Sequence, residues 1–169
     1  APDWRRALEA VRGCPRYAST PLRAVAFDGV DVLVKEESAR FGIGSFKALG
    51  GVYAVMAAVQ ARHASEDGDA PSLAALFEDE RRTRNAEATF VCASAGNHGI
   101  AVAVGAALLG ARARIHLSAE VPEDFAERLR GRGADVLRSG TTYEESLDAA
   151  RRDAEDGAGE LIADTAWDD

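Results

Sequence analysis

The sequence has few cysteines and no apolar run long enough to cross a membrane. Cys14 and Cys92 stand far apart and outside any C-x-x-C or Cys/His spacing, so we expect buried thiols in a reducing compartment, without a disulfide or a metal site. The longest apolar stretch, residues 100–109, is too short to span a bilayer. The first residues lack the apolar core of a signal peptide. We therefore expect a cytoplasmic protein without a membrane partner.

Positive charge is outnumbered by negative charge and is not clustered. The 169 residues include 28 acidic and 20 basic side chains, which give a formal charge of −8. No basic stripe suited to a phosphate backbone is present, so we expect no nucleic-acid partner. Hydrophobic residues make up 47% of the chain and charged residues 28%, as in ordinary globular proteins. The missing initiator methionine and the abrupt end at Asp169 suggest a fragment of a longer protein.

From about residue 88, short β-rich runs alternate with amphipathic stretches of helical length, which predicts an α/β fold with an open parallel sheet. The predicted strands are 89–93, 113–117, 134–138 and 160–163. The predicted helices are 97–109, 122–130 and 143–155. Thr141 or Thr142 can cap the last of these helices, because a glutamate follows just inside it.

The first half of the chain is less regular. We predict a helix over 4–12, a turn at 20–22, and two strands over 24–27 and 31–35 joined at Asp28-Gly29. Ser45 can cap a helix over 46–62, in which Val52, Val55, Met56 and Val59 form one apolar stripe. Residues 64–70 read as a polar loop and 72–82 as a further helix.

Lys47 is a candidate nucleophile. It is one of only two lysines, the other being Lys35. It lies in the first turn of a predicted helix, where the helix dipole disfavours a cation, and Phe46, Ala48 and Leu49 beside it indicate partial burial. Both effects favour the neutral amine, which is the form that attacks an aldehyde carbon. A lysine that extends from a helix start into solvent is the alternative.

The segment 93–99, ASAGNHG, is a candidate anion site. It follows a predicted strand and opens a predicted helix. Small residues at Ser94, Ala95 and Gly96 let backbone N–H groups approach a ligand, and the helix start adds a positive end that suits a carboxylate. Asn97 and His98 add side-chain donors. A turn that serves packing alone is the alternative.

Together the two segments resemble the fold-type II (tryptophan synthase β-like) pyridoxal-phosphate-dependent enzymes. That family places its Schiff-base lysine in a G-S-F-K segment, as at 44–47, and its carboxylate-binding loop in an S-x-G-N-H/T-G segment, as at 94–99. The resemblance implies pyridoxal 5'-phosphate as cofactor, bound by Phe46, Lys47 and Asn97. It implies substrate contacts from Ser94, Ala95, Gly96, Asn97 and His98.

The resemblance also implies how the chain is organised. Residues 1–87 would form the N-terminal part of the large cofactor-binding domain, with the Schiff-base lysine, and residues 88–169 a small αβ domain with the carboxylate loop. The chain would then cover about the N-terminal half of the family fold. The C-terminal half, which holds the cofactor phosphate and faces the pyridine nitrogen, would be absent. By analogy with the family, we expect a homodimer.

Within this family the chain is most similar to the diaminopropionate ammonia-lyases. Gly50-Gly51 follow F-K-A-L, where dehydratases usually continue F-K-x-R-G-A, and residues 164–167 read D-T-A-W. This similarity implies α,β-elimination of 2,3-diaminopropionate to pyruvate and ammonia, with Lys47 and Asp164 as catalytic residues. Ala95 stands where the ammonia-lyases carry an aspartate, which leaves the substrate enantiomer open. The alternatives are a serine or threonine dehydratase, and a truncated relative that binds a ligand or partner without turnover.

Overall fold

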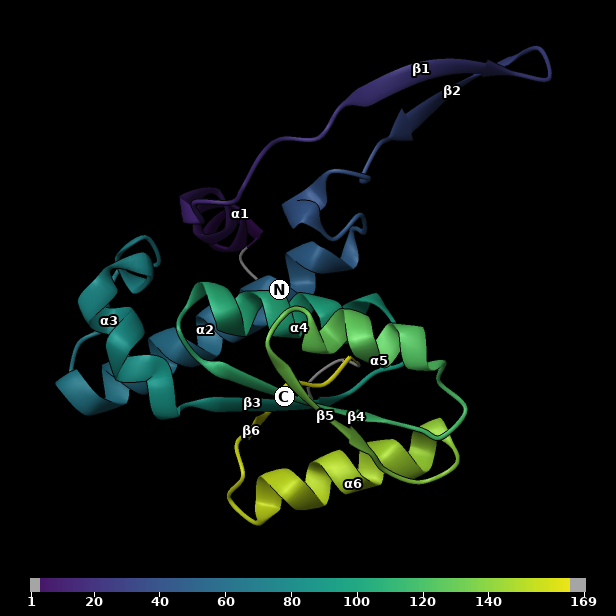
Figure 1. Ribbon diagram of the computed structural model, residues 1–169. Coiled ribbons are helices and arrows are strands. Elements are labelled where there is room, and N and C mark those ends of the chain that lie inside the picture. The colour runs from purple at the N-terminus through teal and green to yellow at the C-terminus, as the bar shows by residue number, and fades with distance from the viewer. Residues whose placement is uncertain (1–3, 165–169) are drawn as a thin grey trace.

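A four-stranded parallel sheet organises the second half of the chain (Figure 1). The structure is a computed structural model that describes residues 4–164. The strand order is β5-β4-β3-β6. The strands are β3 (Thr89–Ala93), β4 (Arg112–Leu117), β5 (Ala134–Arg138) and the short β6 (Glu160–Leu161). The predicted open parallel αβ sheet is confirmed, although β6 is two residues shorter than expected.

Helices cover both faces of this sheet (Figure 1). Helices α4 (Asn97–Leu108) and α5 (Glu123–Arg130) lie on one face, and α6 (Tyr143–Glu155) packs on β3 and β4 from the other. Parallel strands need such crossover helices to connect them. Thr142 caps α6 through a reciprocal capping box with Glu145, as one of the two predicted alternatives. No helix in residues 4–164 is long and apolar enough to cross a membrane.

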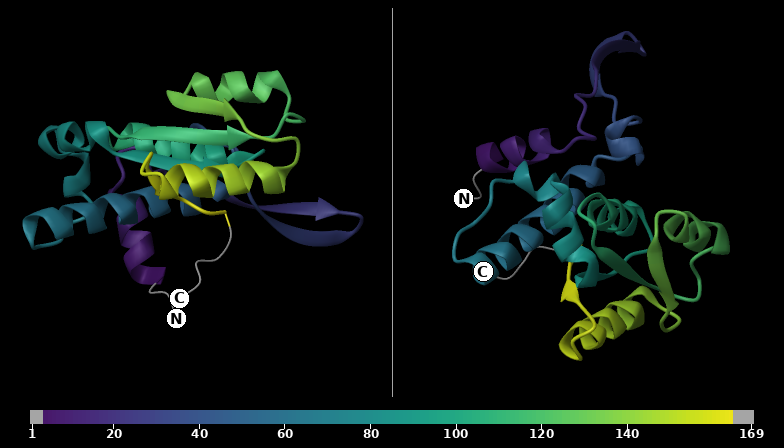
Figure 2. Two further views of the ribbon diagram at one scale, coloured as in Figure 1. Left: turned by 90° about the horizontal axis from the view of Figure 1, so that it is seen from below. Right: turned by 60° about the vertical axis from the view of Figure 1, so that its left-hand side comes forward.

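The first half supplies a long helix and a projecting hairpin. Helix α1 (Trp4–Gly13) precedes the antiparallel pair β1 (Leu22–Phe27) and β2 (Val30–Lys35). The short turn η1 (Arg40–Gly42) leads to α2 (Lys47–Asp67), which runs alongside α4 (Figure 2). The chain then passes through η2 (Ala75–Phe77), α3 (Asp79–Arg84) and η3 (Asn85–Glu87) before it enters the sheet.

Helix α2 is longer than the sequence predicted. Residues 64–67, expected in a polar loop, continue the helix, which ends at Gly68 with a left-handed φ of 78°. Glu66 and Asp67 accept hydrogen bonds from Arg84, and Glu66 also pairs with Arg62 one turn earlier. Because Arg84 lies on the separate helix α3, these ion pairs depend on tertiary structure and leave no periodic signal in the sequence.

Two other local predictions are wrong. The single helix expected over 72–82 is broken into η2 and α3, because Glu78 has an extended backbone (φ −67°, ψ 141°) and starts a new helix. The turn expected at 20–22 does not form, since Leu22 already belongs to β1 and pairs with Lys35. In contrast, the hairpin turn lies where predicted, with positive φ at Asp28 and Gly29.

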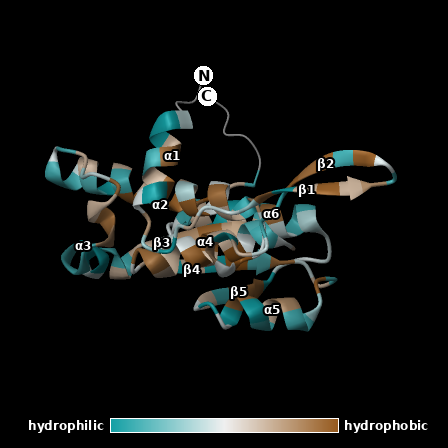
Figure 3. Cartoon of the chain, turned by 90° about the horizontal axis from the view of Figure 1, so that it is seen from above, coloured by the Kyte–Doolittle hydropathy of each residue, from teal (hydrophilic) through white to brown (hydrophobic). Residues whose placement is uncertain are grey.

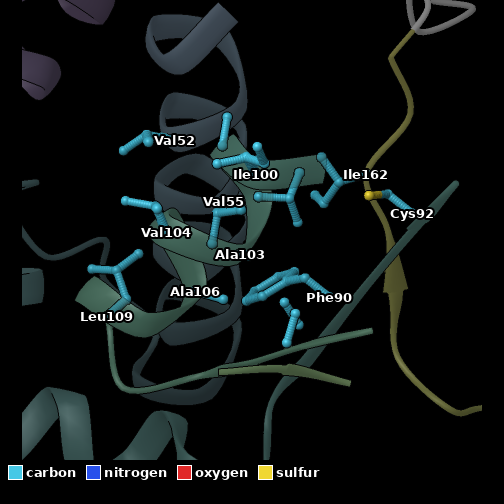
Figure 4. Close-up of a cluster of buried hydrophobic side chains, with 14 of the residues drawn as sticks. Val52, Val55, Phe90, Cys92, Ile100, Ala103, Val104, Ala106, Leu109 and Ile162 are labelled. Carbon is cyan, nitrogen blue, oxygen red and sulfur yellow. The ribbon is translucent and has the colours of Figure 1, made fainter. Parts of the chain in front are cut away.

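The hydrophobic core is centred between α2 and α4 (Figure 4). The predicted stripe on α2 is fully buried, and it consists of Val52, Val55, Met56 and Val59. The same core includes Phe90 from the sheet and Ile162 beyond β6, so it contains residues from both predicted segments. The division into domains at 87 and 88 stays a prediction.

Two glycines let α2 and α4 approach closely. A Cβ atom built on Gly51 would lie only 2.5 Å from Ala101 Cβ on α4. A Cβ atom on Gly105 would lie 3.2 Å from both Val52 Cα and Val55 Cβ on α2. Carbon atoms in van der Waals contact are about 3.5–4.0 Å apart. The small residue at position 51 is therefore a packing requirement.

The β1–β2 hairpin extends away from the rest of the molecule (Figures 1 and 2). Every residue of both strands is exposed, although several are apolar (Figure 3). The large exposed side chains are Leu22, Val25, Phe27, Val30, Val32, Leu33 and Val34. Such a surface is unusual for a monomeric protein.

We predict opposite effects for alanine at two adjacent glycines of α2. Gly51→Ala should lower the free energy of unfolding by roughly 1–3 kcal/mol, because the new methyl group collides with Ala101. Gly50→Ala is the matched control, since a Cβ atom at that position would meet nothing within 4 Å, and it should stabilise the helix by up to about 1 kcal/mol. Urea denaturation measures both. Equal effects would show that the helices are not in the close contact described.

Candidate active site

A cavity of about 360 Å³ opens between the starts of α2, α4 and α6 and the segment after β6. It contains every residue that the sequence singled out, namely Phe46, Lys47, Ser94, Ala95, Gly96, Asn97, His98 and Asp164. These residues come from three separate parts of the chain. The cavity lies at the carboxyl ends of the parallel strands, where ligands of open α/β sheets bind. The roles predicted for these residues stay predictions.

Lys47 faces Asp164 across this cavity. The Nζ atom lies 2.8 Å from both Oδ1 and Oδ2 of Asp164, and the two side chains are 40% and 29% exposed. The apolar surroundings expected for Lys47 are only partly present. Ala48 is buried, but Phe46 is 68% exposed, and the nearest group to Nζ is a carboxylate. An amine and an acid in direct contact can exchange a proton with each other or with a ligand between them.

The loop after β3 is held in shape by Ser94. Its Oγ accepts hydrogen bonds from the backbone N–H groups of Gly96 (3.2 Å) and Gly99 (3.0 Å). A Cβ on Gly99 would lie 3.1 Å from Ser94 Cβ, so the close turn favours glycine there. The Ser94 hydroxyl is thus engaged within the loop, and the substrate contact that the sequence predicted through the backbone N–H groups here stays a prediction.

The start of α4 is open toward the cavity. Gly96 is the N-cap residue and has no side chain, while Ser94 Oγ accepts a hydrogen bond from the N–H of Gly99 in the first turn. The first N–H groups of a helix have no partner within the helix, and the dipole makes this end positive. Asn97 is exposed at this end and also lines the cavity. The local structure is thus suited to an anionic group such as a carboxylate.

His98 connects α4 to the segment that carries Asp164. The ring is buried, its Nε2 lies 3.2 Å from the backbone oxygen of Ile162, and its Nδ1 lies 3.6 Å from Asp164 Oδ1. A carbonyl oxygen only accepts hydrogen bonds, so Nε2 carries a proton. The sequence predicted His98 as a donor to substrate. That role stays a prediction, and the contacts of His98 in the structure hold residues 162–164 against the helix.

Tyr143 is a cavity residue that the sequence analysis missed. It was predicted only as the first residue of a helix, yet its side chain lines the cavity with Lys47 and Asp164. Burial raises the pKa of the Tyr143 phenol, and the nearby charge of Asp164 raises it further. Because the start of α6 lies at the carboxyl edge of the sheet, the ligand-site rule for parallel sheets provided a signal that could have identified it.

A buried arginine fixes the chain before Lys47. Arg40 is 4% exposed and donates from Nε and Nη2 to the two carboxylate oxygens of Glu37, at 2.7 and 2.9 Å. It also donates to Thr20 Oγ1 at 2.6 Å and to the Ala18 carbonyl at 3.0 Å. The hydrogen bonds from Arg40 outweigh burial and hold the Glu37 pKa at about 2. The network ties η1 to the segment before the hairpin.

The other two histidines bond away from the cavity. His63 Nε2 lies 2.9 Å from Asn85 Oδ1 at the far end of α2. His116 on β4 lies 2.8 Å from Ser139 Oγ and 3.1 Å from Asp153 Oδ2 on α6. These contacts connect a strand to its covering helix.

The amino-acid sequence shows the family to which the chain belongs. The sequence matches the family described as Pyridoxal-phosphate dependent enzyme over residues 14–169. The chain therefore belongs to the pyridoxal-phosphate-dependent enzymes, and its fold is the fold-type II arrangement. Pyridoxal phosphate is the cofactor of this family.

Three relatives define the similarity more closely. The diaminopropionate ammonia-lyase of Salmonella typhimurium is 35% identical over 90% of this chain and 39% of its own length. A Sinorhizobium medicae protein named "Probable D-serine dehydratase" is 31% identical over 92% of this chain and 36% of its own. The crystal structure of apo Escherichia coli diaminopropionate ammonia-lyase superimposes with a TM-score of 0.81 and 26% identity, over 96% of this chain and 45% of that one. The chain thus spans about two fifths of the length of these curated relatives.

We predict that the Glu37–Arg40 pair supports the fold in a pH-dependent way. The Glu37 pKa is about 2 in the folded protein against an ordinary 4.5. Its stabilising contribution is therefore fully present above about pH 4.5 and is lost as the pH falls toward 2. Glu37→Gln should lower the free energy of unfolding at neutral pH by roughly 1–3 kcal/mol, because it leaves a buried guanidinium without its counter-charge.

The neighbouring Glu36→Gln is the control for this prediction. Glu36 pairs with Arg23 at the surface, where both side chains are exposed, so its loss should leave the free energy of unfolding nearly unchanged. Denaturation at neutral pH and near pH 3 measures both variants. A Glu37→Gln protein as stable as the parent at neutral pH would contradict a stabilising role for the Glu37–Arg40 pair.

Proposed function

We propose that this chain supplies the reactive lysine and the carboxylate-binding loop of an ammonia-lyase that acts on 2,3-diaminopropionate. The observation that carries this proposal is the position of Lys47 Nζ, 2.8 Å from both oxygens of Asp164, in a cavity that the loop 94–98 also lines. The names of the relatives support the substrate. Because the chain spans about two fifths of those relatives, the activity proposed is that of the whole protein.

The residues of the cavity fit pyridoxal phosphate. Lys47 is half-exposed and open to the cavity, so its amine can reach an aldehyde carbon and hold the cofactor as a Schiff base. Asn97 would hydrogen-bond the cofactor's phenolic oxygen, and the exposed Phe46 ring would contact the cofactor beside it. When bound, the cofactor supplies the electron sink for the negative charge left at the substrate Cα.

The chain's own residues would perform the remaining steps. The N–H groups of Asn97 and His98 at the start of α4 hold the substrate carboxylate. Lys47 takes the proton from Cα, and Asp164 protonates the β-nitrogen as the Cβ–N bond breaks. With one water, diaminopropionate then gives pyruvate and two molecules of ammonia. His98 holds the segment that carries Asp164. Ala95 leaves no carboxylate at its position in the loop, so we propose that only one substrate enantiomer is processed.

One observation favours a second candidate function. The Sinorhizobium medicae relative is named as a D-serine dehydratase, and the same residues could remove a β-hydroxyl group instead of an amine. Serine loses its β-hydroxyl group as water, and diaminopropionate loses its β-amine as ammonia. The two reactions therefore differ only in the leaving group. A homodimer and a cytoplasmic location stay predictions.

We predict that only one of the two lysines forms a covalent bond with the cofactor. Added pyridoxal phosphate should give a visible absorbance band that borohydride removes, with the reduced adduct on Lys47. Lys47→Arg should abolish the band, because arginine keeps the charge opposite Asp164 but cannot form a Schiff base. Lys35→Arg is the matched control and should leave the band intact. A colourless protein that ignores the cofactor would favour a relative without turnover.

We predict that Asp164→Asn uncouples cofactor binding from turnover. The variant should keep the visible band, while pyruvate release from diaminopropionate should fall by roughly 10²-fold or more, as for other general acids. Asp148→Asn, at an exposed position of α6, is the control and should retain full turnover. Assays with diaminopropionate and with D- and L-serine decide the substrate. Undiminished turnover by the variant would remove Asp164 from the mechanism.

A further inference from the structure

We propose a second ligand site, for a small oxyanion carried on an apolar group, at the end of α4 remote from Lys47. A cavity of about 480 Å³ lies where the last turn of α4 meets the segments after α1 and α5. Cavities of roughly 300–1,000 Å³ are typical of small-molecule sites. The cavity shares no lining residue with the one around Lys47. This inference does not depend on the proposed function.

Among residues 4–164, three arginines and no acidic residue line this cavity. They are Arg16, Arg82 and Arg132. The chain as a whole has 28 acidic residues and a charge of −8, so a cavity with this composition departs from its surroundings. An arginine fork binds phosphate and carboxylate groups through paired hydrogen bonds. The composition therefore points to an anionic ligand.

Two of these three arginines have no acidic partner among the described residues. Arg84, for comparison, pairs with Glu66 and Asp67. Within residues 4–164, neither Arg16 nor Arg132 forms an ion pair; Arg132 Nη1 donates to a backbone oxygen at 3.1 Å. Positive charge thus remains available at the cavity.

Arg82 has a structural role as well. Its Nε donates to the Leu108 carbonyl at 3.1 Å, as expected for a cation at a helix C-terminus, and its Nη1 lies 3.6 Å from the fully exposed carboxylate of Asp79. This capping role explains Arg82, but it does not explain why Arg16 and Arg132 line the same cavity.

The remaining lining is largely apolar. Val104, Ala107 and Leu108 come from the last turns of α4, and the other lining residues are Pro15, Phe77 and Gly131. A lining that combines apolar side chains with arginines suits a ligand that has both an oxyanion and a hydrocarbon or aromatic part. Helix α4 has 12 residues and is therefore about 18 Å long. It joins this cavity to the one around Lys47.

Calorimetric titration of the full chain tests the proposal. The probes are phenyl phosphate, benzoate and inorganic phosphate. We expect phenyl phosphate or benzoate to bind with one site per chain, and inorganic phosphate to bind more weakly because it lacks the apolar part. Whichever of phenyl phosphate and benzoate binds more tightly shows whether the site prefers a phosphate or a carboxylate. Arg16→Ala and Arg132→Ala should each weaken this binding by about tenfold. Arg82 is left unchanged, because it caps α4.

The controls separate this site from general charge effects. Arg152→Ala removes the same charge from an exposed position of α6, on the opposite face of the sheet, and should leave the affinity unchanged. Thermal unfolding confirms that each variant is folded. The proposal is overturned if none of the probes binds, if Arg152→Ala weakens binding as much as Arg16→Ala and Arg132→Ala do, or if those two variants bind as tightly as the parent. Inorganic phosphate that binds as tightly as phenyl phosphate would overturn the apolar subsite.

Discussion

The contact between α2 and α4 sets the geometry of the Lys47 cavity. Lys47 is the first residue of α2, and Asn97 is the first residue of α4. Because Gly51 has no side chain, the two helices can approach until Ala101 fills the space that a Cβ would occupy. A closely packed core transmits such a displacement rather than absorbing it. The cavity therefore depends on the absence of one methyl group as much as on the groups that line it.

Around this contact, hydrogen bonds hold the cavity residues in place from behind. His98 bonds to the backbone at Ile162, Ser94 organises its own loop, and Arg40 fixes the approach to Lys47 through Glu37. Cys92 lies in the core nearby, where burial raises the pKa of its thiol and keeps it uncharged. The hydrogen-bonding groups of His98, Ser94 and Arg40 have protein partners before a ligand binds. The site is therefore preorganised.

The sequence predicted the periodic parts of the fold well and the non-local parts poorly. Strands β3 and β5 and helix α6 lie at the predicted residues because hydrophobic periodicity and the cap at Thr142 are local signals. The end of α2 was missed because its support comes from Arg84, which lies 17 and 18 residues further along the chain. A local pattern carries no record of such a partner.

The candidate site shows the same division. The residues of the two motifs were brought into one cavity as expected, together with Asp164. The sequence could not show that the Ser94 hydroxyl is used within its own loop or that His98 bonds to Ile162, because both depend on side-chain direction. The D-T-A-W segment was predicted over 164–167, and its last three residues lie outside the described residues. Tyr143 belongs to neither motif, and it lines the cavity because α6 begins at the carboxyl edge of the sheet.

The β1–β2 hairpin has a practical consequence for handling the protein. It exposes seven large apolar side chains, from Leu22 to Val34, and both strands have a free edge in the two-stranded sheet. An exposed apolar edge is a template for strand addition by another chain. The hairpin is therefore the part of the described structure where association between copies is expected to begin. Mutations that place lysine along β1 or β2 would improve the protein's solubility without touching the cavity around Lys47.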